Sequence, residues 1–312
     1  MIGTVTLNPC IDRTISLNHL DVGEMNRMVL SRRDVSGKGI NVSIALRNFG
    51  IPVKSCGFIY EGNKDFFLSS LIGNGIEFSG IEVPGILREN LKIWDQSCNI
   101  TTEINQSGEY VSEDKWNEFK CFFRTFISDL ELLILSGSVP KGIRVNAYKE
   151  LMEIAEEEDI PVFLDAEGEL LLEGLSLHPV LIKPNLYEFR KTFSLEDYSI
   201  DSIARKAQEV SRQYGIRYVF VSLGKDGALL ISDDGAIRSP ALDIPVKSTQ
   251  GAGDAFVSGA AKAFVENGSG RQMLSYGMAA SASAVMKEGT EMCDLSSFLE
   301  LLPSVKIEEI GR

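Results

Sequence analysis

The sequence predicts an α/β protein in which helices cover a mostly parallel β-sheet. From residue 113 onward, short apolar runs typical of buried strands alternate with segments of helical periodicity. Residues 53–83 show the same strand-helix-strand rhythm. The chain has 312 residues and 44% of them are hydrophobic, so one large domain or two ordinary ones could form a core without disulfide or metal support.

The elements expected before residue 112 fall into two groups. The first group gives a buried strand at 1–7, a helix at 40–50 that ends at a glycine, a strand at 53–60, a helix at 64–72 and a strand at 76–83. The second group is made of residues 14–34 and 87–104, which lack a helical period and alternate polar with apolar residues. We expect these two segments to form a small separate sheet.

The elements expected after residue 112 continue the alternation. They are a helix at 113–128, a strand at 132–136, a helix at 145–158, strands at 161–165 and 180–183, a helix at 200–214, a strand at 218–222, a hairpin of 228–231 with 236–238, and helices from 254 to 265, 270–286 and 295–301. No internal repeat or linker divides the chain. We therefore expect a single domain over residues 1–312.

Composition excludes several classes of protein. The net charge of −13 and the lack of a Lys/Arg-rich run argue against nucleic-acid binding. Five cysteines without CxxC spacing indicate neither a disulfide framework nor a structural zinc site. The N-terminus lacks a basic, apolar leader, and no run of about 18 apolar residues follows. We expect a cytoplasmic protein that does not bind membranes.

The most informative stretch is residues 246–256, where an apolar segment passes through Gly251 and Gly253 into a helix-like segment. Glycine lets the backbone approach a ligand closely, and the helix should begin near Asp254. The free N–H groups of a first helical turn form an anion site. Asp254 is then either the helix cap or a base aimed at a hydroxyl that attacks the anion.

Polar residues also follow other apolar runs, at positions where the carboxyl ends of parallel strands would meet. They occur at Asp12, 37–39, 136–138, Asp165, 183–185, 222–224 and 251–254. Each one alone is ordinary turn chemistry, since Gly, Ser, Asp and Asn dominate turns. Their accumulation favours a ligand site.

Seven motifs in order and spacing resemble the ribokinase-like PfkB family of carbohydrate kinases, in its 1-phosphofructokinase and tagatose-6-phosphate kinase branch. They are Thr6-Leu7-Asn8-Pro9 with Asp12, Gly37-Lys38-Gly39-Ile40-Asn41-Val42, Thr102-Glu103-Ile104-Asn105, Ser136-Gly137-Ser138-Val139-Pro140, Ile182-Lys183-Pro184-Asn185 with Glu188, Val221-Ser222-Leu223-Gly224, and Ser248-Thr249 with Gly251-Ala252-Gly253-Asp254. The resemblance covers essentially the whole chain. It implies a three-layer α/β/α core and a small β-sheet lid formed by about 13–35 and 87–110.

The resemblance implies that Asp254 is the catalytic base and that Gly251, Ala252 and Gly253, here called the anion-binding loop, form the anion hole. Phosphoryl transfer asks mainly for positioning and charge neutralisation, which one carboxylate beside a helix N-terminus can supply.

ATP and Mg²⁺ are the cofactors that the resemblance implies. Asn185 and Glu188 would organise the metal, since residues i and i+3 share a helix face and Mg²⁺ prefers oxygen ligands. The alternative is a helix-start Asn with a solvated Glu. The nucleotide-binding residues implied are Lys183, Asn185, Ser222, Gly224, Ser248, Gly251 and Gly253.

For the acceptor, the resemblance places Asp12 on sugar hydroxyls and Lys38 and Arg88 near the phosphate that the substrate already carries. Arg and Lys would give this acidic protein a local positive site. Glu103 would contact either the sugar or water. The other acceptor-site residues implied are Gly37, Gly39, Asn41, Asn90, Ser138 and Arg27.

The chain departs from the branch pattern at a few positions, which concern the identity of the substrate more than the kinase chemistry. They are Ser36 before Gly37, Leu87 and Glu89 around Arg88, Ala166 and Glu167 after Asp165, and 61–63 in place of a glycine-rich turn. Other chemistries lack their motifs. There is no P-loop, no opening GxGxxG and no nucleophile elbow, and the two histidines cannot form a His-rich metal site.

We expect an ATP- and Mg²⁺-dependent kinase that phosphorylates fructose 1-phosphate on its 6-hydroxyl. The alternative acceptor is tagatose 6-phosphate, and the alternative of another class is a catalytically silent sugar-phosphate or nucleotide sensor. The extended segments of the lid could pair two subunits into a homodimer, or they could simply close over substrate.

Overall fold

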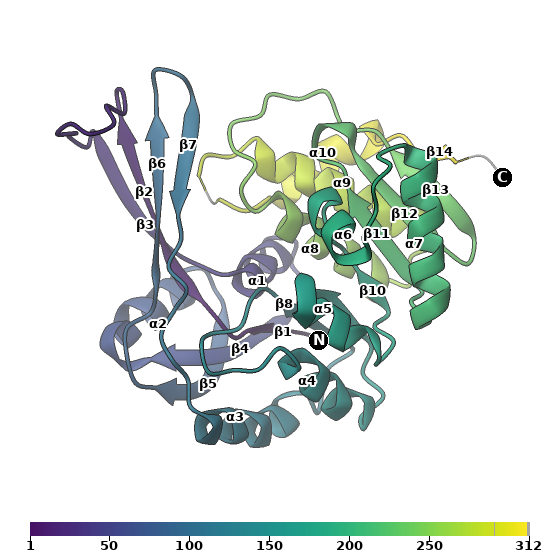
Figure 1. Ribbon diagram of the computed structural model, residues 1–312, viewed down its shortest axis with the longest axis horizontal. Helices are drawn as coiled ribbons and strands as arrows, with labels where there is room; N and C mark the ends of the chain where they lie inside the picture. The colour runs from purple at the N-terminus through teal and green to yellow at the C-terminus, as the bar shows by residue number, and fades with distance from the viewer. Residues whose placement is uncertain (290, 311–312) are drawn as a thin grey trace.

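The computed structural model describes residues 1–289 and 291–310, which form two β-sheets with helices around the larger one (Figure 1). The larger sheet has the strand order β14-β13-β12-β11-β10-β9-β8-β1-β4-β5. Its strands in chain order are β1 (Ile2–Thr6), β4 (Val53–Tyr60), β5 (Glu77–Val83), β8 (Leu132–Ser136), β9 (Val162–Asp165), β10 (Leu181–Ile182), β11 (Tyr218–Ser222), β12 (Ala228–Ser232), β13 (Gly235–Ser239) and β14 (Glu308–Glu309).

Seven neighbouring strands, from β11 to β5 in the sheet order, are parallel. The strands β12, β13 and β14 add an antiparallel edge. Parallel strands bring their carboxyl ends to one edge of a sheet, so the polar residues that follow them come together there. The expected mostly parallel sheet is confirmed.

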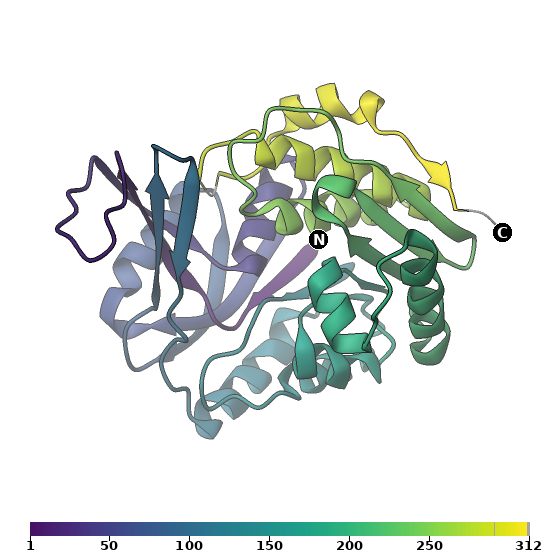
Figure 2. The ribbon, with the colours of Figure 1, turned by 45° about the horizontal axis from the view of Figure 1, so that its top comes forward.

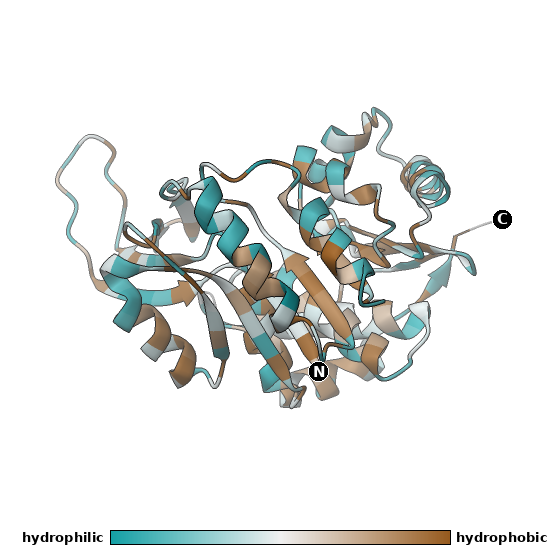
Figure 3. Cartoon of the chain, turned by 90° about the horizontal axis from the view of Figure 1, so that it is seen from below, coloured by the Kyte–Doolittle hydropathy of each residue, from teal (hydrophilic) through white to brown (hydrophobic). Residues whose placement is uncertain are grey.

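Helices cover both faces of this sheet, as β8 illustrates. All five residues of β8 are buried. Leu132 and Ile134 pack on the side of α1 (Lys38–Asn48), α8 (Ala252–Val265) and α9 (Gly270–Val285), whereas Leu133 and Leu135 pack on the opposite side. Figure 3 shows mostly hydrophobic residues along the central strands and mixed hydropathy on the helices around them. An apolar run without alternation is typical of a strand buried on both faces.

The remaining helices complete the two outer layers. They are α2 (Lys64–Gly73), α3 (Glu113–Phe126), α4 (Ala147–Glu156), α5 (Gly168–Leu175), α6 (Leu186–Phe193), α7 (Ile200–Tyr214) and α10 (Leu295–Leu301), with 3₁₀ turns at Glu61–Asn63, Gly224–Asp226 and Leu302–Ser304. None of the helices in the described part of the chain has the length and apolar character needed to span a bilayer.

The second sheet, here called the small sheet, stands apart from the main one (Figure 2). It contains β2 (Cys10–Leu17), β3 (Leu30–Ser36), β6 (Glu89–Asp95) and β7 (Ile100–Ile104) in the order β3-β2-β6-β7. The central strands β2 and β6 are parallel, and the outer strands are antiparallel to them. The two extended segments expected from the sequence therefore do pair with each other.

Most expected elements have the observed type and similar bounds, but three helices and one strand differ. Sequence patterns do not predict α5, which is eight residues long and begins at a glycine in the left-handed region, or the two-residue strand β14. The helix α6 is expected only through a helix start at Asn185 and has no predicted bounds. The helix expected from Asp254 begins two residues earlier, at Ala252. Short elements such as these depend on packing more than on periodicity.

Candidate active site

The anion-binding loop leads into α8 in a geometry that favours glycine. Gly251 is the N-cap residue and has φ 70°, in the left-handed region where a Cβ is strained. The helical hydrogen-bond ladder begins with Ala255 N, which donates to Gly251 O at 2.8 Å. The N–H groups of Ala252, Gly253 and Asp254 precede this ladder, so the first turn can bind an anion.

Asp254 is the third residue of α8 and does not cap the helix. Its Oδ2 accepts a hydrogen bond of 2.8 Å from Asn41 Nδ2, which lies on α1. Asp254 is only 7% exposed, and burial, with the nearby Asp165 charge, raises its pKa to about 6. A carboxylate with a pKa near neutrality is suited to act as a general base.

A second carboxylate, Asp165 at the end of β9, is buried between two lysines. Lys183 Nζ lies 3.5 Å from its Oδ1 and Lys38 Nζ lies 3.6 Å from its Oδ2, while Ser136 Oγ donates to Oδ2 at 2.8 Å. Burial alone would raise the pKa of Asp165, but the two ammonium groups and the Ser136 hydrogen bond hold it below its usual value. Asp165 in turn raises the pKa of Lys38. The cluster thus brings two lysine side chains to one buried carboxylate.

Several of the residues expected on the nucleotide side lie in contact or nearly so. Asn185 and Ser222 are partners in an isolated parallel bridge, and Ser222 N donates to Pro184 O at 3.1 Å. A Cβ added at Gly253 would lie 3.3 Å from Lys183 Nζ, so this ammonium group lies beside the anion-binding loop. Gly224 follows β11 in the left-handed region, and Ser248 Oγ accepts from Gln250 N at 3.2 Å.

Asn185 and Glu188 form a capping box at the start of α6. Asn185 Oδ1 accepts from Glu188 N at 2.8 Å, and Glu188 Oε2 accepts from Asn185 N at 2.9 Å. These bonds leave the second carboxylate oxygen of Glu188 to face a hydrated cation, and Mg²⁺ commonly uses one or two protein carboxylates together with substrate phosphates. Within the described residues, no group of three or more His, Cys, Asp and Glu side chains could hold a metal. The remaining carboxylate oxygen of Glu188 fits a hydrated Mg²⁺ ion that arrives with nucleotide phosphates.

Asp12 lies at the centre of a buried polar network on the small sheet. Lys92 Nζ donates to its Oδ2 at 2.8 Å and Asn90 Nδ2 donates to its Oδ1 at 3.0 Å. Burial would raise the pKa of Asp12, but Lys92 and these hydrogen bonds lower it. Sequence reasoning did not identify Lys92. The alternation of Asn90, Leu91 and Lys92 along an extended segment was a signal that Lys92 shares the face of Asn90.

A cavity of about 160 Å³ lies beside Lys38 and Arg88. Its lining residues are Thr6, Asn8, Lys38, Arg88, Ser136, Gly137, Ser138 and Glu167. The Arg88 guanidinium donates to the backbone oxygens of Pro9, Gln106 and Asn8 at 3.2, 2.9 and 2.9 Å, so three of its five N–H groups hold the chain in place. The other two N–H groups remain for an anion.

Four other residues expected at the acceptor site do not line this cavity: Gly37, Gly39, Glu103 and Arg27. Gly37 is the N-cap of α1, and Gly39 lies so close to β1 that an added Cβ would be 2.6 Å from Val5 O. Glu103 is exposed on β7 and accepts from Gln250 Nε2 at 2.8 Å. Arg27 is exposed in the connection between β2 and β3 and does not line the cavity.

These features define the class of the protein. A helix N-terminus open to an anion, a buried carboxylate with a raised pKa and a pair of lysines meet at the carboxyl edge of the α/β/α core. The fold is ribokinase-like, and the protein is a phosphotransferase. The pattern of the pfkB family of carbohydrate kinases matches residues 5–296. The chain belongs to this family.

Relatives and solved structures agree with this assignment. The 1-phosphofructokinase of Haemophilus influenzae is 30% identical over 308 residues, which are 98% of this chain and 98% of that protein. The 1-phosphofructokinase of Borreliella burgdorferi is 30% identical over 311 residues, 99% of each chain. The crystal structure of Escherichia coli phosphofructokinase-2 in complex with potassium superposes with a TM-score of 0.92 at 25% identity, covering 97% of this chain and 98% of that one.

Proposed function

We propose that this protein is an ATP- and Mg²⁺-dependent 1-phosphofructokinase that transfers the γ-phosphoryl group of ATP to the 6-hydroxyl of fructose 1-phosphate. The products are fructose 1,6-bisphosphate and ADP. The observation that carries the proposal is the position of Asp254, whose buried carboxylate lies at the anion-binding loop and within the electrostatic influence of both Lys38 and Lys183. The 1-phosphofructokinases that match this chain over nearly its whole length support the choice of acceptor.

In the proposed reaction, Asp254 accepts the proton of the attacking hydroxyl. The N–H groups of the anion-binding loop face the phosphoryl group in transfer and stabilise its charge, since they are fixed before the reaction and need no reorganisation. Lys183 lies beside the same loop and adds positive charge on the nucleotide side. A Mg²⁺ ion held with its waters by Asn185 and Glu188 would neutralise the phosphates of the nucleotide.

For the acceptor, we assign sugar hydroxyls to Asp12 and Asn90 and the existing phosphate to the cavity beside Lys38, Arg88 and Ser138. Arg88 keeps two N–H groups for the phosphate, and Lys38 supplies a positive charge at the wall of the cavity. Asn41 fixes Asp254 beside the hydroxyl, while Ser222, Gly224 and Ser248 line the nucleotide side. Arg27 would reach a phosphate only if the connection between β2 and β3 changed position.

The test of the acceptor is ADP release measured with fructose 1-phosphate, fructose 6-phosphate, tagatose 6-phosphate and unphosphorylated fructose. We expect kcat/KM to be highest for fructose 1-phosphate by at least about tenfold. A preference for tagatose 6-phosphate would replace the proposed acceptor and leave the kinase chemistry in place. No ADP release with any of the four sugars would reject the proposed function and favour a silent sensor.

We further propose that two copies of the chain pair through the small sheet, in a reducing compartment such as the cytoplasm. Large apolar side chains are exposed there, at Met28, Val29, Leu30, Ile100 and Ile104. All five cysteines are free thiols, which suits a reducing compartment. Light scattering should give a dimer mass for the wild-type protein and a monomer mass for Ile104→Glu. A monomer in both cases would reject the pairing.

A further inference from the structure

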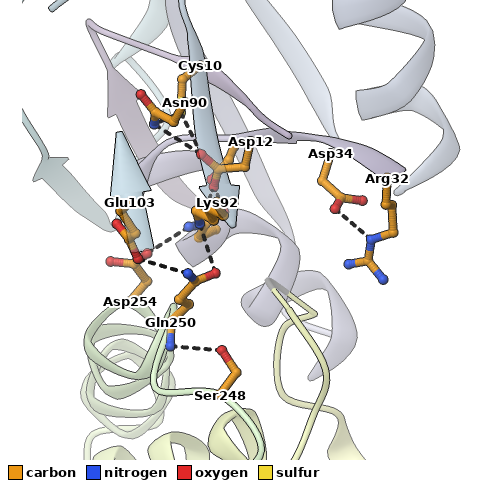
Figure 4. A network of polar contacts seen from close by, with 12 residues as sticks. Cys10, Asp12, Arg32, Asp34, Asn90, Lys92, Glu103, Ser248, Gln250 and Asp254 are labelled. Carbon is orange, nitrogen blue, oxygen red and sulfur yellow. Dashed lines mark hydrogen bonds and ion pairs between the residues drawn. The ribbon is translucent and has the colours of Figure 1, made fainter. Parts of the chain in front are cut away.

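Lys92 connects the small sheet to the loop before the catalytic helix. Its ammonium group is buried, with 6% of the residue exposed, and donates to Asp12 Oδ2 at 2.8 Å and to Gln250 Oε1 at 2.9 Å. Figure 4 shows Lys92 between these two side chains. A buried ammonium needs such partners because burial disfavours its charge. The Lys92 position therefore depends on both Asp12 and Gln250.

Gln250 uses both ends of its amide in this contact. While Oε1 accepts from Lys92 on β6, Nε2 donates to Glu103 Oε1 on β7 at 2.8 Å. One side chain thus binds two neighbouring strands of the small sheet, and only a group that both donates and accepts can satisfy both partners.

The backbone of Gln250 is tied to the anion-binding loop. Its N–H donates to Ser248 Oγ at 3.2 Å, and the next residue is Gly251, the N-cap of α8. A displacement of the Gln250 side chain therefore acts directly on the first turn of α8, in which Asp254 lies.

We propose that Gln250 is a positioning residue that latches the small sheet onto the anion-binding loop through Lys92 and Glu103. The acceptor side, at Asp12, and the phosphoryl-transfer side, at α8, are then aligned by one chain of contacts. This inference adds to the proposed kinase function a residue that touches neither the base nor the phosphates. It rests on that function for its kinetic readout only.

The kinetic test uses Gln250→Met, which keeps a long unbranched side chain and removes both hydrogen bonds, and Glu103→Leu, which removes one of them. With ATP and fructose 1-phosphate we expect kcat to fall about tenfold in each variant, while the KM for ATP stays within about twofold, since the lost contacts position the reacting groups. The double variant should be no slower than Gln250→Met, because both changes break the same latch. Glu103→Gln keeps the acceptor oxygen and should restore the rate.

The matched control is Gln213→Met, the same chemical change on the exposed face of α7. It should leave kcat and the KM values unchanged. A rise in the KM for ATP with normal kcat in Gln250→Met, or multiplicative losses in the double variant, would overturn the positioning role.

A spectroscopic test works without any acceptor. Trp94 lies on β6, two residues beyond Lys92, and is 38% exposed. The sequence contains one other tryptophan, Trp116. In a Trp116→Phe background, a non-hydrolysable ATP analogue with Mg²⁺ should change the emission of Trp94. The response should be lost in Gln250→Met and kept in Gln213→Met.

An unchanged response in Gln250→Met, or no response in the Trp116→Phe parent, would reject the latch. Because this readout needs no phosphoryl transfer, a wrong acceptor assignment would silence the kinetic test and leave the fluorescence result intact.

Discussion

Asn41 and Asp254 join the first turns of two helices across 213 residues of sequence, through a hydrogen bond of 2.8 Å. The Asn41 amide is oriented, because its Oδ1 accepts from Ser36 Oγ at 3.4 Å and its Nδ2 is thereby directed at the carboxylate. A donated hydrogen bond lowers the pKa of Asp254, whereas burial and the Asp165 charge raise it. The Asp254 carboxylate is therefore held in place by a group that also limits its proton affinity.

Replacement of the proposed base should stop turnover. We expect Asp254→Asn to lower kcat by about a thousandfold, because the variant cannot accept the hydroxyl proton. Nucleotide affinity, measured by calorimetry, should change by no more than a few fold, since the anion-binding loop is intact. Asp233→Asn, in the exposed turn between β12 and β13, is the matched control. Near-normal rates for Asp254→Asn would refute the base assignment.

The activity should depend on the ionisation of Asp254. Because burial raises the pKa of Asp254 to about 6, kcat/KM should fall about tenfold per pH unit below that value, where the carboxylate is protonated. Removal of the Asn41 hydrogen bond in Asn41→Leu should move the acidic limb to higher pH. An acidic limb near pH 4 in the wild-type profile would contradict this prediction.

The same carboxylate should cost stability at neutral pH. Its folded-state pKa of about 6 lies above the ordinary value of 3.8, so the protonated form stabilises the fold and this contribution is lost as pH rises through 6. At pH 7.5, Asp254→Asn should be more stable than wild type by about 3 kcal/mol in urea unfolding. The difference should vanish near pH 4. A variant less stable than wild type at pH 7.5 would show that folding does not raise the pKa of Asp254.

The proposed phosphate contact predicts an unequal effect on the two substrates. Arg88→Ala should raise the KM for the sugar phosphate at least about tenfold and the KM for ATP by less than about twofold. Because Arg88 also binds three backbone oxygens, thermal unfolding must be measured alongside. Arg88→Lys, which keeps the charge, should be intermediate. Equal increases in both KM values would argue against this placement.

A metal role for Glu188 can be separated from its role as a helix cap. Glu188→Gln keeps an oxygen that can accept from Asn185 N, so the capping box should survive and the melting temperature should change little. The loss of charge should raise the Mg²⁺ concentration needed for half-maximal rate by about tenfold. An unaltered Mg²⁺ requirement would leave Glu188 with a capping role alone.

Sequence patterns predicted the framework of the fold because central strands such as β8 are apolar runs and the helices α3, α7, α8 and α9 have at least 14 residues each. The strands at 53–60, 132–136 and 218–222 and the helix at 200–214 have the expected bounds. The helix α5 escaped prediction because eight residues with three consecutive leucines carry no clear period.

The polar site was predictable only in part. Asp254 follows a glycine turn, a local signal that sequence can reveal. Lys92 and Gln250 are 158 residues apart, and their contact depends on the register of β2 against β6 and on how the small sheet meets the loop before α8. Neither relationship leaves a local pattern. The packing of Asp165 between two lysines likewise becomes visible only in three dimensions.

Because Asp165 forms ion pairs with two lysines, it constrains how the substrate preference of this protein can evolve. Lys38, on the proposed acceptor side, and Lys183, on the proposed nucleotide side, both form an ion pair with one buried carboxylate. A substitution at Lys38 that suited a different sugar would leave Asp165 with a single neighbouring lysine. The pKa of Asp254 would then rise further, because Asp165 raises it and Lys38 lowers it. Changes of acceptor should therefore arise through compensated pairs of mutations, with Asp165 altered together with one of its lysines.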